Sequence, residues 1–117
     1  RVIEVVAMFG YKEAIPKIRL VLADGSLDQT TRMVSARALG RLDAEGNKQV
    51  LLTAFDQCTK LESTVRVAIA EALAQTRDRS VLAKLETWAR GEAPGTFERK
   101  HFDRIVSEMR TRLQQVQ

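Results

Sequence analysis

One segment of the chain occurs twice, and this internal repeat constrains the fold more than any other feature. Residues 30–39 read TTRMVSARAL, and residues 64–73 read TVRVAIAEAL. Threonine, arginine, two alanines and leucine recur at matching positions, so that Leu39 corresponds to Leu73. The period of the repeat is the step from Thr30 to Thr64, and a fixed period of roughly 20–50 residues is typical of stacked supersecondary units. A period of this length accommodates two helices and two turns, which predicts an array of helix pairs.

Both copies have the spacing of an amphipathic helix, with apolar or small residues recurring three or four positions apart. In the first copy these residues are Thr31, Val34, Ser35, Ala38, Leu39 and Leu42. In the second copy they are Val65, Ala68, Ile69, Ala72 and Leu73. Small side chains let helix axes approach closely, which suits a helix with several neighbours. One helix pair cannot bury its apolar stripe alone, so the pattern predicts packing against further pairs.

We therefore expect an all-α fold, a right-handed α-solenoid of about three and a half antiparallel helix pairs. Seven helices are expected, over residues 1–10, 12–24, 28–42, 48–58, 64–76, 81–90 and 96–115. Asp28 and Thr96 have the residue type and position of N-caps. Residues 1–117 have the size of a single domain. Because the first residues already read as the middle of a helix, we expect a fragment of a longer protein.

The composition is that of a folded protein, with 44% hydrophobic and 29% charged residues. The net charge of +4 is mildly basic and is compatible with ordinary solubility or with a nucleic-acid surface. No apolar run approaches ~20 residues, so we expect no membrane-spanning helix. No signal peptide is visible. The compartment stays unassigned, with a soluble, cytoplasmic location slightly favoured.

Few residues have the pattern of an active site or a metal site. His101 is the only histidine and Cys58 the only cysteine, so we expect neither zinc nor a disulfide. Cys58 is expected to be a buried thiol, and Trp88 is expected to pack rather than to stack on a nucleotide. Two carboxylate pairs are expected to be solvated, Glu98 with Asp103 and Asp43 with Glu45. Because no phosphate loop or nucleophile motif occurs, we expect no catalysis, no metal and no cofactor.

A second line of inference comes from a series of residue types, Glu13-Ala14-Ile15-Pro16 followed by Leu22, Asp24, Asp28, Arg32, Ala36, Ala38, Leu39, Gly40 and Leu42. This series resembles the bacterial form of the HEAT repeat, and the second copy, with Glu62 and Val65-Arg66, is similar. The resemblance covers residues 13–90. It departs from the family at Thr31, where valine is usual, and at Ala74, which replaces the glycine matching Gly40.

In HEAT repeats the recurring arginine and the acidic residue before it usually tie adjacent repeats together. The resemblance implies this role for Arg32 with Asp28. It implies the same role for Arg66 with Glu62. Each is an i, i+4 pair, which contributes ~0.3–0.5 kcal/mol on an exposed helix. We interpret both pairs as structural.

The resemblance also implies that the second helix of each pair lines the concave side of the array. The outward positions of these helices form a candidate partner-binding face, called the candidate face below, and are Arg37, Arg41, Glu71, Gln75, Arg104 and Glu108, followed by Arg112. Arg37 and Glu71 occupy matching positions of the two copies and should be neighbours. A phosphate-binding groove requires continuous positive charge, which Glu71 interrupts. The mixed charge favours a protein partner.

We expect a non-catalytic interaction scaffold that presents this curved, mixed-charge face to a protein or peptide partner, or to a neighbouring domain of the same chain. One alternative is the C-terminal helical region of a zinc aminopeptidase, since bacterial enzymes of the thermolysin-like superfamily often end in similar repeats. Another is nucleic-acid binding as in DNA-alkylation-repeat proteins, with Arg32, Arg37, Arg41, Arg99, Lys100, Arg104, Arg110 and Arg112 as supporting residues. A third is a bilin-lyase-like accessory protein, for which no residue argues specifically.

Overall fold

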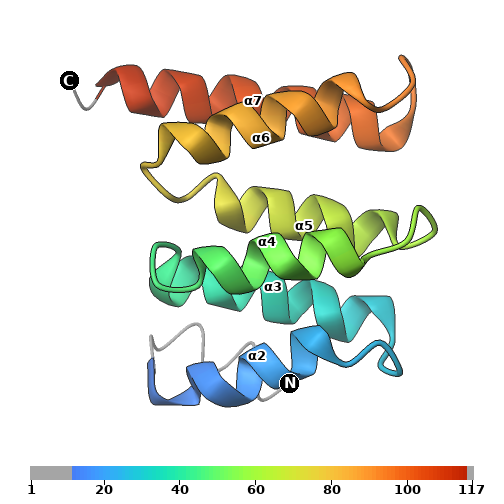
Figure 1. The fold of residues 1–117 in the computed structure, drawn as a ribbon, viewed down its shortest axis with the longest axis vertical. Helices are drawn as coiled ribbons and strands as arrows, with labels where there is room; N and C mark the ends of the chain where they lie inside the picture. Colours follow the sequence, from blue (N-terminus) through green and yellow to red (C-terminus); the bar gives the residue numbers. More distant parts are fainter. Residues whose placement is uncertain (1–11, 116–117) are drawn as a thin grey trace.

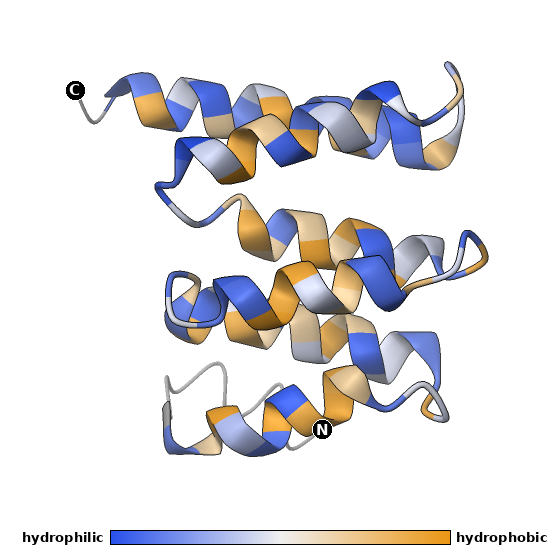
Figure 2. Ribbon diagram, viewed as in Figure 1, coloured by the Kyte–Doolittle hydropathy of each residue, from blue (hydrophilic) through white to orange (hydrophobic). Residues whose placement is uncertain are grey.

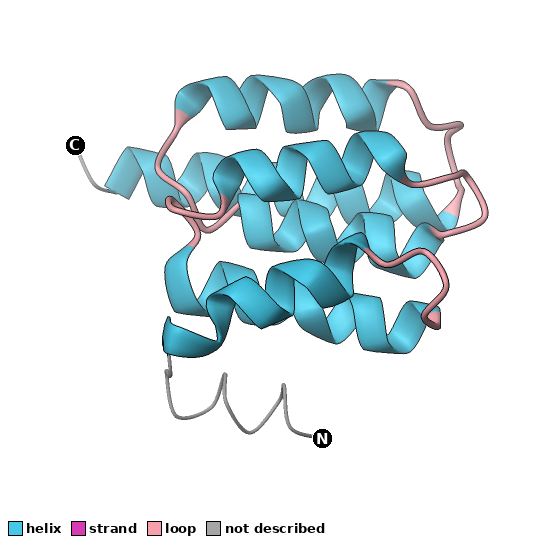
Figure 3. Cartoon of the chain, turned by 60° about the horizontal axis from the view of Figure 1, so that its bottom comes forward, coloured by secondary structure: helices cyan, strands magenta, loops and turns pink. Residues whose placement is uncertain are grey.

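The computed structural model describes residues 12–115, and every regular element in this range is helical. A 3-10 turn, η1 (Lys12–Ala14), leads into six α-helices. They are α2 (Ile15–Ala23), α3 (Gln29–Asp43), α4 (Lys48–Gln57), α5 (Ser63–Leu73), α6 (Arg79–Arg90) and α7 (Phe97–Gln115). Because residues 12–115 contain no strand, the predicted all-α class is confirmed (Figure 3). The helix expected over residues 1–10 lies outside the described residues.

The helices alternate in direction along the chain (Figure 1). Helices α3, α5 and α7 lie side by side, since α3 contacts α5 and α5 contacts α7. Helices α2, α4 and α6 each pack against the helix that follows in the chain. The shortest dimension of the molecule is 20 Å, which matches two layers of helices about 10 Å in diameter. The loops 24–28, 58–62 and 91–96 lie at one edge, at the right of Figure 1.

Side-chain caps begin two of the helices where the sequence predicts them. The carboxylate of Asp28 accepts a hydrogen bond from the N–H of Thr31 at 2.7 Å. The hydroxyl of Thr96 accepts one from the N–H of Arg99 at 3.2 Å. Both caps satisfy N–H groups that have no partner within the helix. The predicted helix 12–24 begins instead as a 3-10 turn, and Pro16 lies in the first turn of α2, where its missing N–H costs nothing.

Helix α5 stops at Leu73 and not at Thr76. The hydroxyl of Thr76 donates to the carbonyl of Leu73 at 2.8 Å and closes a turn there. Helix α6 begins at Arg79, before the predicted start at Val81. Its cap is the carboxylate of Asp78, because this group accepts a hydrogen bond from the N–H two residues later.

The core lies in the seams between the helices, where apolar residues face one another (Figure 2). Leu39 and Leu73, at matching positions of the repeat, are both fully buried. Helices α3 and α5 come so close at Gly40 that an added Cβ would lie 2.6 Å from the Cβ of Ala72. Real Cβ atoms do not approach to this distance, so a side chain at Gly40 would push the two helices apart.

Candidate functional site

The candidate face lies on the layer formed by α3, α5 and α7, and its first six residues come in pairs from α3, from α5 with the turn after it, and from α7. These residues are Arg37 and Arg41 on α3, Glu71 and Gln75 at α5 and its C-terminal end, and Arg104 and Glu108 on α7. The two side chains on α3 and the two on α7 are four residues apart and therefore lie on the same side of their helix, whereas Gln75 lies in the turn just after α5. All six are at least partly exposed to solvent.

A groove of about 370 Å³ lies between α3 and α5, and four of the six residues line it. Among the described residues, its lining consists of Arg37, Gly40, Arg41, Glu71, Ala72 and Gln75. Gly40 and Ala72 are the two small residues at which the helices meet, so the long side chains stand on either side of them. A groove of this volume is at the lower end of ligand pockets and holds a few side chains.

Ion pairs connect the three helices across the candidate face. Oε2 of Glu71 accepts a hydrogen bond from Nη2 of Arg104 at 3.0 Å, whereas Oε1 of Glu71 lies 3.7 Å from Nη2 of Arg37. The predicted neighbour relation of Arg37 and Glu71 is thus confirmed. Arg104 also donates to Glu108 at 3.1 Å. Because these side chains are between about a third and two thirds exposed, solvent screens the pairs and each contributes only ~0–1 kcal/mol.

Arg41 and Gln75 differ from the other four residues of the candidate face. Both side chains are exposed, and neither has a hydrogen-bond or ion-pair partner within residues 12–115. They occupy matching positions of the repeat, one turn beyond Arg37 and Glu71. Arg112, which the sequence also places on this side, donates to the carbonyl of Thr76 at 3.1 Å and is partly buried. Its role is therefore structural.

Two other arginines, predicted as surface pairs, are buried. The side chain of Arg32 donates from Nε to the carbonyl of Leu22 at 3.1 Å and from Nη1 to Oε2 of Glu62. Only 5% of Arg32 is exposed. The residue thereby joins α3 to the end of α2 and to the residue that precedes α5. This pairing reaches across to the next helix pair.

Arg66 makes the corresponding connection one repeat later. Nη2 of Arg66 donates to Oε2 of Glu92 at 3.0 Å, and Nη1 lies 3.9 Å from Oε2 of Glu98. The guanidinium lies over the rings of Phe55 and Phe102, at 5.0 Å and 5.6 Å from their centroids. The predicted i, i+4 pair of Arg66 with Glu62 is wrong, because Glu62, which precedes α5, pairs with Arg32. The partners of Arg66 are instead Glu92 and Glu98, which are distant in the sequence and lie nearby in the folded chain.

The carboxylates that hold these arginines have lowered pKa values. The N–H of Thr59 donates to Glu62 at 2.8 Å and, together with Arg32, keeps the pKa of Glu62 below its ordinary value, although burial opposes this. Burial also raises the pKa of Glu92, but hydrogen bonds from Lys60 and Arg66 outweigh it, and the net shift is downward. Both groups are therefore ionised at neutral pH, as required for ion pairing with arginine.

Trp88 and Cys58, two further residues considered from the sequence, pack against other residues of the fold. The Trp88 ring stacks on Phe55 with centroids 3.5 Å apart and planes within 6°, so its predicted packing is confirmed. Cys58 lies just after α4 and is half-buried against the core, less enclosed than predicted, and burial raises the pKa of its thiol. Its thiol stays protonated at neutral pH and is a poor nucleophile.

Each carboxylate of the two pairs considered from the sequence has its own partner. Glu98 accepts a hydrogen bond from the hydroxyl of Ser63, and Asp103 accepts one from Nε of Arg99 at 3.0 Å. The other two accept hydrogen bonds from backbone N–H groups, Asp43 from Gly46 and Glu45 from Arg77. Across the described part of the chain, no group of three or more His, Cys, Asp or Glu side chains is arranged to hold a metal ion.

Comparison of the chain with models of protein families, with curated proteins and with solved structures finds no match in any of the three. Among the described helices, none combines the length and the apolar character needed to cross a bilayer.

Proposed function

We propose that this chain is a HEAT-like helical-repeat module, an α-solenoid whose candidate face binds a protein or peptide partner without catalysis. The partner is a separate protein or another domain of the same parent chain. The observation that carries this proposal is the groove between α3 and α5, whose walls come from matching positions of two consecutive repeat units. Helix-lined grooves of this kind suit an extended or helical segment of a partner.

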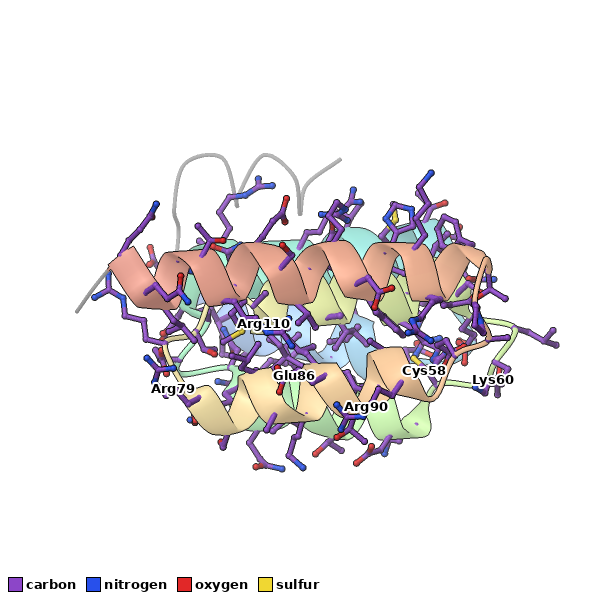
Figure 4. All side chains as sticks on the ribbon, turned by 90° about the horizontal axis from the view of Figure 1, so that it is seen from above. Cys58, Lys60, Arg79, Glu86, Arg90 and Arg110 are labelled. Atoms are coloured by element: carbon purple, nitrogen blue, oxygen red, sulfur yellow. The ribbon has the colours of Figure 1, made fainter. Side chains whose placement is uncertain are left out.

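Most arginines that would support nucleic-acid binding are already engaged. Arg32 is buried, and Arg112 donates to a backbone carbonyl. Arg99 pairs with Asp103 on its own helix. Nε of Arg110 on α7 donates to Glu86 on α6 at 3.0 Å, and Figure 4 shows both side chains between these two helices. A nucleic-acid backbone requires a continuous row of available cations, so a protein partner is favoured.

The test is a selection of a random peptide library, displayed on phage, against the immobilised protein. Affinities of the selected peptides are then measured by fluorescence anisotropy for the wild type, Gln75→Trp and Lys84→Trp. The indole at position 75 fills the groove, whereas Lys84 is an exposed residue of α6, in the other layer. We expect Gln75→Trp to weaken binding at least about tenfold, or ~1.4 kcal/mol, and Lys84→Trp to leave it unchanged.

Two results would contradict the proposal. One is a selection that yields no binding peptide. The other is a set of peptides that bind Gln75→Trp as tightly as the wild type. A duplex oligonucleotide provides the comparison for the alternative function, because binding that weakens steeply with added salt would indicate a phosphate-backbone contact.

A further inference from the structure

We infer that the groove between α3 and α5 binds an acidic side chain of the partner, with Arg41 as the cationic contact. This inference rests on the proposed function, because it specifies the chemistry of the partner at the same groove. It follows from a difference between two matching pairs of positions, Arg37 with Glu71 and Arg41 with Gln75.

The first pair contains its own carboxylate. Glu71 lies between Arg37, at 3.7 Å, and Arg104, at 3.0 Å, so its single negative charge serves two guanidinium groups. The groove itself contains two arginines and one glutamate, which is a net charge of +1 (2 − 1). The groove therefore contains more guanidinium groups than carboxylates.

The second pair leaves a positive charge without a partner. Arg41 precedes Gln75 by one period of the repeat, just as Arg37 precedes Glu71. A neutral amide occupies the position at which a carboxylate would complete the pattern. Within residues 12–115 the guanidinium of Arg41 has no hydrogen-bond or ion-pair partner, and neither has the amide of Gln75. An incoming carboxylate fits between them, because arginine donates to it and the amide of Gln75 supplies a further N–H.

The shape of the groove permits this approach. The helices α3 and α5 meet at Gly40 and Ala72, which also line the groove. Because both residues are small, no large side chain there separates a partner from Arg37 and Arg41. Arg37 and Arg41 are one helical turn apart, about 6 Å along the axis. Arginine is suited to this contact because its planar fork binds a carboxylate through two parallel hydrogen bonds.

An isolated carboxylate explains the arrangement better than a nucleic-acid backbone does. Of the arginines on the candidate face, Arg104 is bound to Glu71 and Glu108, and Arg37 shares Glu71. Among the arginines of this face within the described residues, Arg41 alone has neither a hydrogen-bond nor an ion-pair partner. A polyanion that followed this face past Arg41 would meet Glu71 in the groove and Glu108 on α7, and both would repel it.

The experiment uses the peptides that the library selection yields. We expect aspartate or glutamate in most of them, and we expect about tenfold weaker binding when that residue is changed to its amide. Arg41→Gln should cost the same factor, whereas Lys84→Gln, on α6 in the other layer, should cost nothing. Arg41→Gln should add no further loss for the amide form of the peptide, because the two changes remove the same contact.

The outcomes separate this inference from the proposed function. Peptides that depend on position 75 but lack an acidic residue, and that bind Arg41→Gln like the wild type, would overturn the acidic contact and leave the interaction scaffold in place. Peptides that bind Gln75→Trp as tightly as the wild type would overturn both the acidic contact and the proposed function. Tight binding of a duplex oligonucleotide that Arg41→Gln abolishes would assign the anion to phosphate and also overturn the inference.

Discussion

The two arginine systems of this protein differ in burial, although they are built from the same residue types. Arg32 and Arg66 lie inside the molecule, and each reaches a glutamate of the following helix pair. Arg37 and Arg104 lie on the candidate face and share Glu71 in water. A buried pair that loses one partner leaves a charge without hydration, whereas an exposed pair is replaced by water. The first system therefore stabilises the fold, and the second is available for a partner.

Removing a buried arginine should have the largest effect on stability. Arg66→Met leaves Glu92 and Glu98 enclosed without their guanidinium, and we expect the free energy of unfolding to fall by ~3 kcal/mol or more. The measurement is urea unfolding followed by circular dichroism. The matched exposed variant, Arg104→Gln, should change it by less than ~1 kcal/mol. Equal effects of the two variants would mean that burial does not distinguish the two systems.

The close contact of α3 with α5 should have the next largest effect on stability, because the space at Gly40 leaves no room for a side chain. Gly40→Ala places a Cβ 2.6 Å from that of Ala72, and we expect a loss of ~1–3 kcal/mol as the helices move apart. Gly25→Ala is the control, since no atom lies within 4 Å of its added Cβ. A Gly40→Ala variant as stable as the wild type would show that the two helices adjust freely.

The dependence of stability on pH should follow the partly buried carboxylates that hold Arg32 and Arg66. The pKa values of Glu62 and Glu92 are lowered in the folded state from an ordinary value of 4.5. A group of this kind stabilises the fold above its unfolded pKa, and the contribution is lost as the pH falls through the folded pKa. We expect the free energy of unfolding to decrease as the pH is lowered from about 5 towards 3.

The double variant Glu62→Gln/Glu92→Gln provides the test of this pH dependence. It should be less stable than the wild type at pH 7, and its unfolding free energy should change less between about pH 5 and 3. Glu108→Gln, which removes an exposed carboxylate, should retain the wild-type slope. An unchanged slope in the double variant would assign the acid sensitivity to other groups.

The smallest effect on stability is expected on the candidate face, where Glu71→Gln should change the unfolding free energy by less than ~1 kcal/mol. The same change releases Arg37 and Arg104 from their shared carboxylate. We therefore expect acidic peptides to bind Glu71→Gln several-fold more tightly, as measured by anisotropy at low salt. Weaker binding would indicate that Glu71 itself contacts the partner.

Local patterns in the sequence were sufficient to predict the described helices, two helix caps and one contact between helices. The helical spacing identifies the buried Leu39 and Leu73, and residue type identifies the caps Asp28 and Thr96. The repeat places Glu71 next to Arg37. These features depend on neighbours along the chain or on a constant offset between units, and both can be read without coordinates.

The partner of Arg66 could not be predicted in the same way. Glu92 follows it by 26 residues and lies in the loop after α6, where no spacing rule connects the two. The i, i+4 rule assumes an exposed helix, but Val65 to Ala70 of α5 are all buried between neighbouring helices. The contact of Arg112 could not be predicted either, because its acceptor is the backbone carbonyl of Thr76, just after α5.

The stack of Trp88 on Phe55 gives this protein an optical reporter of its own interior. Trp88 is the single tryptophan of the chain, and the Phe55 ring beneath it also lies under the guanidinium of Arg66. Its emission should shift to longer wavelength when that neighbourhood takes up water. Fluorescence can therefore follow loosening of the helix seams at nanomolar protein concentration and without an added dye.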